Sequence, residues 1–150
     1  MRLNRVLFTL ATLACCGTSP NLLGADAGIA KIVSGDVRVE RTGESLPLRV
    51  GDTLLSKDRI VVPAKGGAGI SLMDDTLISL GPNSVFVIDQ FAFNAITREG
   101  LIDTSILRGA MQYVTGQIGR FAPQAVRVVT RTALIGIRGT EFIVEVPDEY

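Results

Sequence analysis

Hydrophobic residues in this chain recur at every second position more often than at helical spacing. Val37 and Val39 alternate with Arg38 and Glu40, which is typical of a strand with one buried face. Alternation, or a short β-branched run, returns at residues 46–50, 60–62, 70–72, 77–80, 85–88, 101–107, 110–115, 125–130 and 140–146. Gly, Asp, Asn and Pro separate these segments about every ten residues. The pattern predicts many short strands.

A helix competes with strands over residues 103–114 only. Gly109 and the β-branched residues of this segment disfavour the helix. A chain of 150 residues has room for one ordinary domain. We therefore predict a single, compact all-β domain, a β-roll or sandwich of many short strands with little helix.

The N-terminal segment has a different pattern. Arg2 and Arg5 precede an apolar run over residues 6–16, and Ala25 and Ala27 form an A-x-A site. This is the three-part pattern of a secretory signal, and its apolar run is too short to span a bilayer permanently. We predict a signal peptide at residues 1–27, cleavage after Ala27, and a domain over residues 28–150 that is periplasmic or secreted by a bacterial cell.

Both cysteines lie within that segment. Cys15 follows a Thr-Leu-Ala sequence that resembles a bacterial lipobox, although leucine is usual where Thr12 stands, and Cys16 follows another cysteine. We favour soluble export over a lipoprotein, so that membrane attachment would require acylation of Cys15 or an uncut signal. Cleavage after Ala27 would leave no cysteine, and hence neither a disulfide nor thiol chemistry.

Composition narrows the function. The chain has no histidine, and 15 basic residues balance 15 acidic ones. Histidine-based triads and histidine–metal sites are therefore excluded. Zero net charge argues against nucleic acid as a partner. No P-loop or nucleophile-elbow pattern is present either. We expect no enzymatic activity, no cofactor and no metal.

Asp74 and Asp75 are adjacent in sequence and lie between two predicted strands, at residues 70–72 and 77–80. Paired carboxylates can hydrolyse glycosides or bind calcium, so a carbohydrate-active or calcium-dependent exported protein is the alternative function. Aspartate is also a common turn former, because it accepts hydrogen bonds from nearby backbone N–H groups and tolerates a left-handed conformation. The D-x-D-x-D-G pattern of a calcium loop is absent. We favour the turn.

Five short motifs follow one another along the chain. They are G-D-x-L at 51–54, D-x-I at 58–60, L-M-D-D-T-L at 72–77, L-G-P-N-S at 80–84 and I-R-G-T-E-F at 137–142. Together they resemble the FecR domain family, over roughly residues 29–146. In that family a glycine commonly follows the aspartate of the central turn, where this chain has Asp75.

The resemblance implies a periplasmic, non-catalytic β domain. Signalling members of the family relay the state of an outer-membrane receptor to a sigma factor, through a cytoplasmic anti-sigma segment and a transmembrane helix. Here only the predicted signal precedes the domain, so we do not expect direct sigma-factor control. We expect a stand-alone FecR-like module of the cell envelope that binds a protein or ligand, with a regulatory or signalling-related role.

The family signature is expected to be structural. It comprises Gly136, Arg138, Gly139, Thr140, Glu141 and Phe142. The two glycines indicate a bend, a bulge or a close approach to another backbone. Arg138 lies between apolar residues, so we expect it to be partly buried, to organise a β-corner, and to have Glu141 as a candidate partner.

The last predicted strand, at residues 140–146, places Phe142, Val144 and Val146 on one face and Glu141, Ile143 and Glu145 on the other. Relatives often continue with another strand pair at this point. We therefore expect either a shortened version of a longer protein or a strand that forms an edge of the sheet. Unpaired edges favour strand addition, so the expected partners are an envelope protein or a second copy of the chain.

Overall fold

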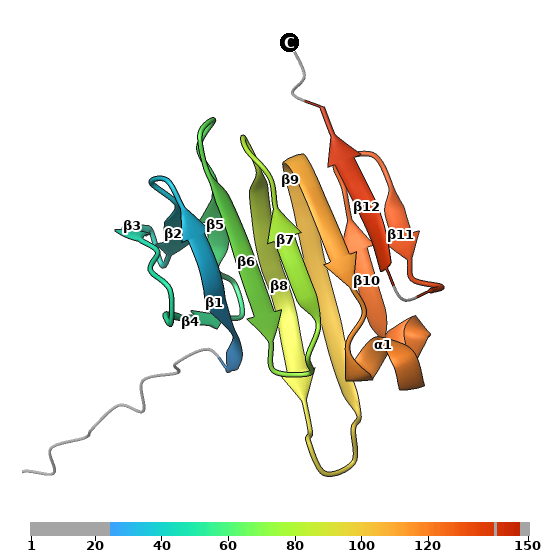
Figure 1. Ribbon diagram of the computed structural model, residues 1–150. Helices are drawn as coiled ribbons and strands as arrows, with labels where there is room; N and C mark the ends of the chain where they lie inside the picture. The colour runs from blue at the N-terminus through green and yellow to red at the C-terminus, as the bar shows by residue number, and fades with distance from the viewer. Residues whose placement is uncertain (1–24, 140, 148–150) are drawn as a thin grey trace, which may run out of the picture.

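A fifteen-residue strand, β9 (Gly100–Val114), runs through the centre of the molecule (Figure 1). The computed structural model describes residues 25–139 and 141–147. In this part of the chain, twelve strands join in one curled sheet. The others are β1 (Asp26–Ser34), β2 (Arg38–Arg41), β3 (Glu44–Pro47), β4 (Thr53–Leu55), β5 (Arg59–Val61), β6 (Gly67–Leu72), β7 (Leu77–Leu80), β8 (Val85–Phe93), β10 (Val126–Val129), β11 (Leu134–Gly136) and β12 (Glu141–Val146). The prediction of an all-β domain is confirmed.

The two halves of the sheet share β9. Its first part, as far as Arg108, pairs antiparallel with β8 and parallel with β10, whose outer neighbour is β11. Its second part, from Gly109, pairs antiparallel with β7 and β12. The order β8–β5–β2–β3 continues one half and β7–β6–β1–β4 continues the other. The sheet curls around one core, with the two halves as its layers (Figure 1).

The change of partners along β9 occurs at Gly109. Its φ is +87°, and a Cβ atom there would come within 2.6 Å of the Cα atom of Ser84. Only glycine fits such a position without displacement of the neighbouring backbone. The two strand segments predicted on either side of Gly109 are thus one continuous strand that bends at this glycine. Residues 103–114 form no helix.

Inward-facing side chains of both halves form the core. One half contributes Ile60, Phe86, Ile88, Ile102 and Ile106, and the other contributes Leu54, Ile70, Leu72, Ile78 and Met111. All of these side chains are buried. Each removes enough apolar surface from water to stabilise the fold by about 1.5–3 kcal/mol before the entropy cost is counted.

Among residues 25–139 and 141–147, helical structure is confined to one end of the sheet. The short helix α1 (Gln117–Phe121) follows β9 and is followed by the 3₁₀ turn η1 (Pro123–Ala125). Ile118 of α1 is fully buried, so the helix closes the end of the core next to β10.

A buried ion pair anchors the opposite side of the sheet. The Asp58 carboxylate accepts hydrogen bonds from Arg41 Nε at 2.7 Å, from Arg41 Nη2 at 2.6 Å and from the backbone N–H of Leu55 at 2.8 Å. Asp58 is buried, and the hydrogen bond to its carboxylate raises the pKa of Arg41. The pair links β2 to the turn between β4 and β5.

Candidate functional site

Asp74 lies at the turn between β6 and β7 and is fully buried. Its carboxylate accepts hydrogen bonds from the backbone N–H and the hydroxyl of Thr76, at 3.2 and 2.9 Å, and from the backbone N–H of Ile118, at 3.2 Å. Burial raises the pKa of Asp74, and the hydrogen bonds partly oppose this shift. Asp74 therefore connects the central turn to the start of α1.

Asp75 faces the surface, where its carboxylate accepts a hydrogen bond from Gln117 Nε2 at 2.8 Å. Its φ is +66°, which explains why a glycine suits this position. The hydrogen bond from the Thr76 N–H to Asp74 and the left-handed conformation of Asp75 are those that the turn interpretation expects. Within the described residues, no group of three or more acidic or cysteine side chains is placed to hold a metal ion.

The signature residues form the crossover from one half of the sheet to the other. Gly136 ends β11 in one half, and β12 begins in the other half at Glu141. Between them Ile137 is buried, and Gly139 has φ +143° and accepts a hydrogen bond at its carbonyl from Thr115 Oγ1 at 3.1 Å. Thr140 lies outside the described residues. The expected corner is present.

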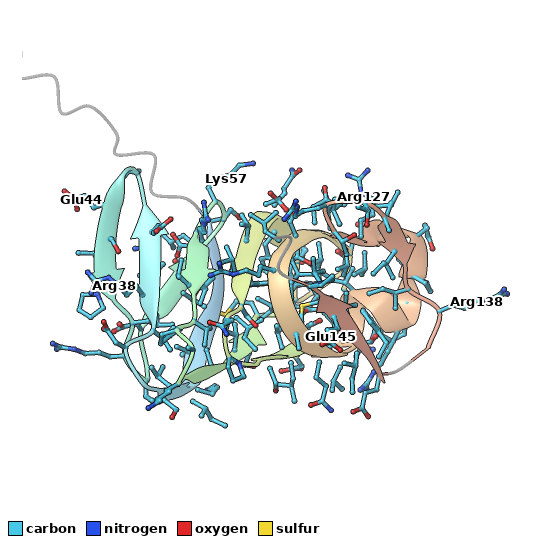
Figure 2. All side chains as sticks on the ribbon, turned by 90° about the horizontal axis from the view of Figure 1, so that it is seen from above. Arg38, Glu44, Lys57, Arg127, Arg138 and Glu145 are labelled. Carbon is cyan, nitrogen blue, oxygen red and sulfur yellow. The ribbon has the colours of Figure 1, made fainter. Side chains whose placement is uncertain are left out.

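The role expected for Arg138 within this corner is wrong. Its side chain is exposed and makes no hydrogen bond or ion pair with the described residues. Figure 2 shows it directed outward at the end of the molecule opposite Arg38 and Glu44. Glu141, its expected partner, accepts a hydrogen bond from Gln112 instead. Ile137 fills the core, whereas the next residue, Arg138, projects into solvent.

The glycines of the signature have different settings. A Cβ atom at Gly136 or at Gly139 would meet open space, so neither glycine is required by close approach to another backbone. Gly139 is explained by its positive φ, whereas Gly136 has no such conformation. The fold therefore gives no reason for a glycine at position 136.

The strand β12 lies at an edge of the sheet, as expected. Among the described strands it pairs with β9 alone. Val144 is buried, Phe142 and Val146 are half-buried, and Glu141, Ile143 and Glu145 are exposed. Ile143 is 73% exposed, a high value for a large apolar side chain.

A groove of about 500 Å³ lies beside the crossover, and none of the sequence motifs indicates it. It is lined by Pro123, Gln124, Val126, Arg127, Leu134, Gly136, Ile137 and Arg138. The sequence does carry a signal for it: residues 104–140 contain five arginines and no acidic residue. The zero net charge of the whole chain conceals this local imbalance.

The two alanines of the predicted cleavage site lie at the start of the domain. Ala25 is exposed, whereas Ala27 belongs to β1 and is fully buried. The Ala27 carbonyl accepts a hydrogen bond from the Met73 N–H at 3.0 Å, and the Ala25 carbonyl accepts one from the Ser56 N–H at 3.3 Å. Cys15, the predicted lipidation site, and residues 1–24 of the predicted signal lie outside the described residues.

These features define an all-β protein with a buried aspartate at its central turn and a glycine–arginine crossover between β11 and β12. The chain belongs to the FecR family: the model of the family described as FecR protein matches residues 58–149, more than half of the chain. The match begins at Asp58, so the motif at 51–54 lies outside it. No curated protein and no solved structure matches the chain.

Membership of this family associates the chain with the cell envelope and with regulation or signalling. Within residues 25–139 and 141–147, no helix is long and apolar enough to cross a membrane.

Proposed function

We propose that the protein is a non-catalytic, exported module of the bacterial cell envelope that holds a partner protein by adding a strand of that partner to β12. Family membership supports a regulatory setting. The observation that carries the proposal is the edge of β12 that no described strand pairs with, where an exposed Ile143 lies between two exposed glutamates. A strand added there continues the backbone hydrogen bonding of the sheet.

The side chains of β12 favour a partner strand with basic side chains over a second copy of the chain. In an antiparallel pair, residues directly opposite one another lie on the same face of the sheet. If a second copy paired with Ile143 opposite Ile143, Glu141 would face Glu145 of the other copy at both ends. Like charges in that position are destabilising. A strand that alternates apolar residues with lysine or arginine would instead place opposite charges there.

A defined peptide tests this proposal. A short fluorescein-labelled peptide that alternates valine with lysine is titrated with the full domain, and binding is followed by fluorescence anisotropy. We expect Glu141→Lys combined with Glu145→Lys to weaken binding about tenfold or more, because attraction becomes repulsion at two positions.

The matched control is Glu44→Lys combined with Glu99→Lys, which changes the net charge equally at two exposed positions away from β12. Retention of binding by this control supports the edge as the site. Equal weakening of both double variants would show general charge attraction and contradict the proposal. A stable dimer of the unmodified chain that is lost in the β12 variant would identify a second copy as the occupant, and would also contradict it.

A further inference from the structure

We propose that the groove beside the crossover is a second binding site, and that it takes an extended, acidic peptide segment of a partner protein. The site does not depend on the edge of β12. The groove lies where β10 begins after η1 and where β11 ends, with Gly136 directly opposite Arg127 in the strand pair. Because glycine has no side chain, the outer surface is open above Gly136.

The walls of the groove are apolar and its rim is cationic. Pro123, Leu134 and Ile137 supply apolar lining, and Leu134 is 65% exposed. A ligand side chain that covers this exposed apolar surface of the groove removes it from water, which favours binding.

The two arginines of the groove differ in whether their guanidinium groups can bind a ligand carboxylate. Arg127 already donates hydrogen bonds from Nε and Nη2 to Asp103, at 2.7 and 2.6 Å. The Arg127 guanidinium therefore already has a carboxylate partner, and we assign to this residue only a role in lining the groove. Arg138 makes no such pair with the described residues, so a ligand carboxylate can approach it without breaking an existing ion pair. An arginine fork binds a carboxylate through two parallel hydrogen bonds.

The form of the ligand follows from β11. This strand pairs only with β10 among the described strands, so its other side offers unpaired backbone groups. An extended peptide can use these groups as an added strand. Arg127 and Arg138 line the groove and no acidic residue does, so charge complementarity favours a peptide with acidic side chains. Gly136 is explained as the residue that leaves room for this peptide, since the fold itself does not require it.

A short fluorescein-labelled peptide that alternates valine with glutamate tests the site by anisotropy. Gly136→Leu fills the groove without backbone strain, because the position has open space and no positive φ. We expect it to abolish binding, and Arg138→Glu to weaken binding about tenfold or more. Circular dichroism and the melting temperature verify that both variants fold.

The matched control is Arg49→Glu, an equal charge change at an exposed arginine near the start of β4. It is expected to leave the affinity unchanged. Equal weakening by Arg49→Glu and Arg138→Glu, or undiminished binding by Gly136→Leu, would overturn the proposal. So would failure of the unmodified chain to bind this peptide while it binds an oligogalacturonate, which would identify an acidic saccharide as the ligand. The β12 variants Glu141→Lys and Glu145→Lys should still bind the acidic peptide. Loss of binding at the edge of β12 can therefore be distinguished from loss of binding at the groove.

Discussion

The Phe142 ring stacks on the Tyr113 ring, with the centroids 5.0 Å apart and the planes at 21°. The two residues lie opposite one another on β12 and β9. Tyr113 is fully buried beside Thr76 and Asp74 of the central turn, and this burial raises the pKa of its hydroxyl. The last residue of the signature and the central turn, far apart in sequence, thus meet across β9.

Replacement of Phe142 should loosen β12. Phe142→Ala removes the stacked ring and half-buried apolar surface, and we expect a loss of about 2–3 kcal/mol in the free energy of unfolding. Phe142→Leu should cost less, because it retains apolar volume. Urea unfolding measures both. Ile143→Ala, on the exposed face of the same strand, is the control and should change stability by less than about 0.5 kcal/mol; a larger loss there than at Phe142 would contradict the stacking.

Asp74 should make stability depend on pH. Because burial raises its pKa in the folded state above the usual 3.8, the folded protein binds this proton more tightly than the unfolded chain does. The contribution of Asp74 is therefore largest below pH 3.8 and is lost as the pH rises through the raised pKa. Asp74→Asn cannot titrate, and its amide would face the Thr76 N–H, so it should be less stable by about 1–3 kcal/mol.

Denaturant unfolding of both proteins across this pH range provides the measurement. The difference in stability between the native chain and Asp74→Asn should shrink as the pH increases. A difference that stays constant, or grows with pH, would show that the folded-state pKa of Asp74 is not raised.

Asp75→Gly should preserve or increase stability. The φ of +66° strains a residue with a Cβ atom, and glycine relieves this strain, an effect of about 1 kcal/mol. The change also removes the exposed hydrogen bond from Gln117, which is worth less. Asp75→Ala is the matched variant, because it loses the same hydrogen bond and keeps the strain. Thermal unfolding should rank Asp75→Gly above Asp75→Ala, and the reverse order would refute the backbone argument.

Arg138→Ala should leave the melting temperature unchanged, because the side chain is exposed and has no partner in the described structure. A substitution at the neighbouring residue, Ile137, should by contrast lower the stability. Ile137 is 6% exposed, and Ile137→Ala should cost about 2–4 kcal/mol through lost burial and a cavity. Calorimetry of the two variants tests the inward–outward alternation of the crossover, and a clear loss of stability in Arg138→Ala would restore a structural role for the arginine.

The position of the mature N-terminus should affect folding. A chain that begins at Gly28 lacks the Ala27 and Ala25 carbonyls, which accept hydrogen bonds from the Met73 and Ser56 N–H groups. It also places a charged α-amino group at a buried residue. We expect this chain to be less stable, by about 2 kcal/mol or more, than one that begins at Ala25.

Melting temperatures of the two purified chains make the comparison, and equal values would contradict it. Cleavage after Ala27 stays a prediction. The intact mass of the exported protein identifies the residue at which the mature chain begins.

Alternation of residue types predicted most of the strands and, in β12, the face that is buried, but β4 and β11 lie outside the predicted segments. It could not predict that β9 changes partners at Gly109, or that β10 pairs parallel with β9, because these pairings join distant segments. The five-residue helix α1 is too short for a helical period to show. Arg138 was misjudged for a related reason: apolar neighbours in sequence do not bury a residue where the chain turns a corner.

The bend at Gly109 has a consequence for how the domain unfolds. Since β9 supplies hydrogen bonds to both halves of the sheet, neither half can separate without exposing a strand that the other half needs. We expect the halves to unfold in one cooperative step, with the amides of β9 among the slowest to exchange with deuterium. A partner that binds at either end of the sheet would then raise the melting temperature of the whole domain.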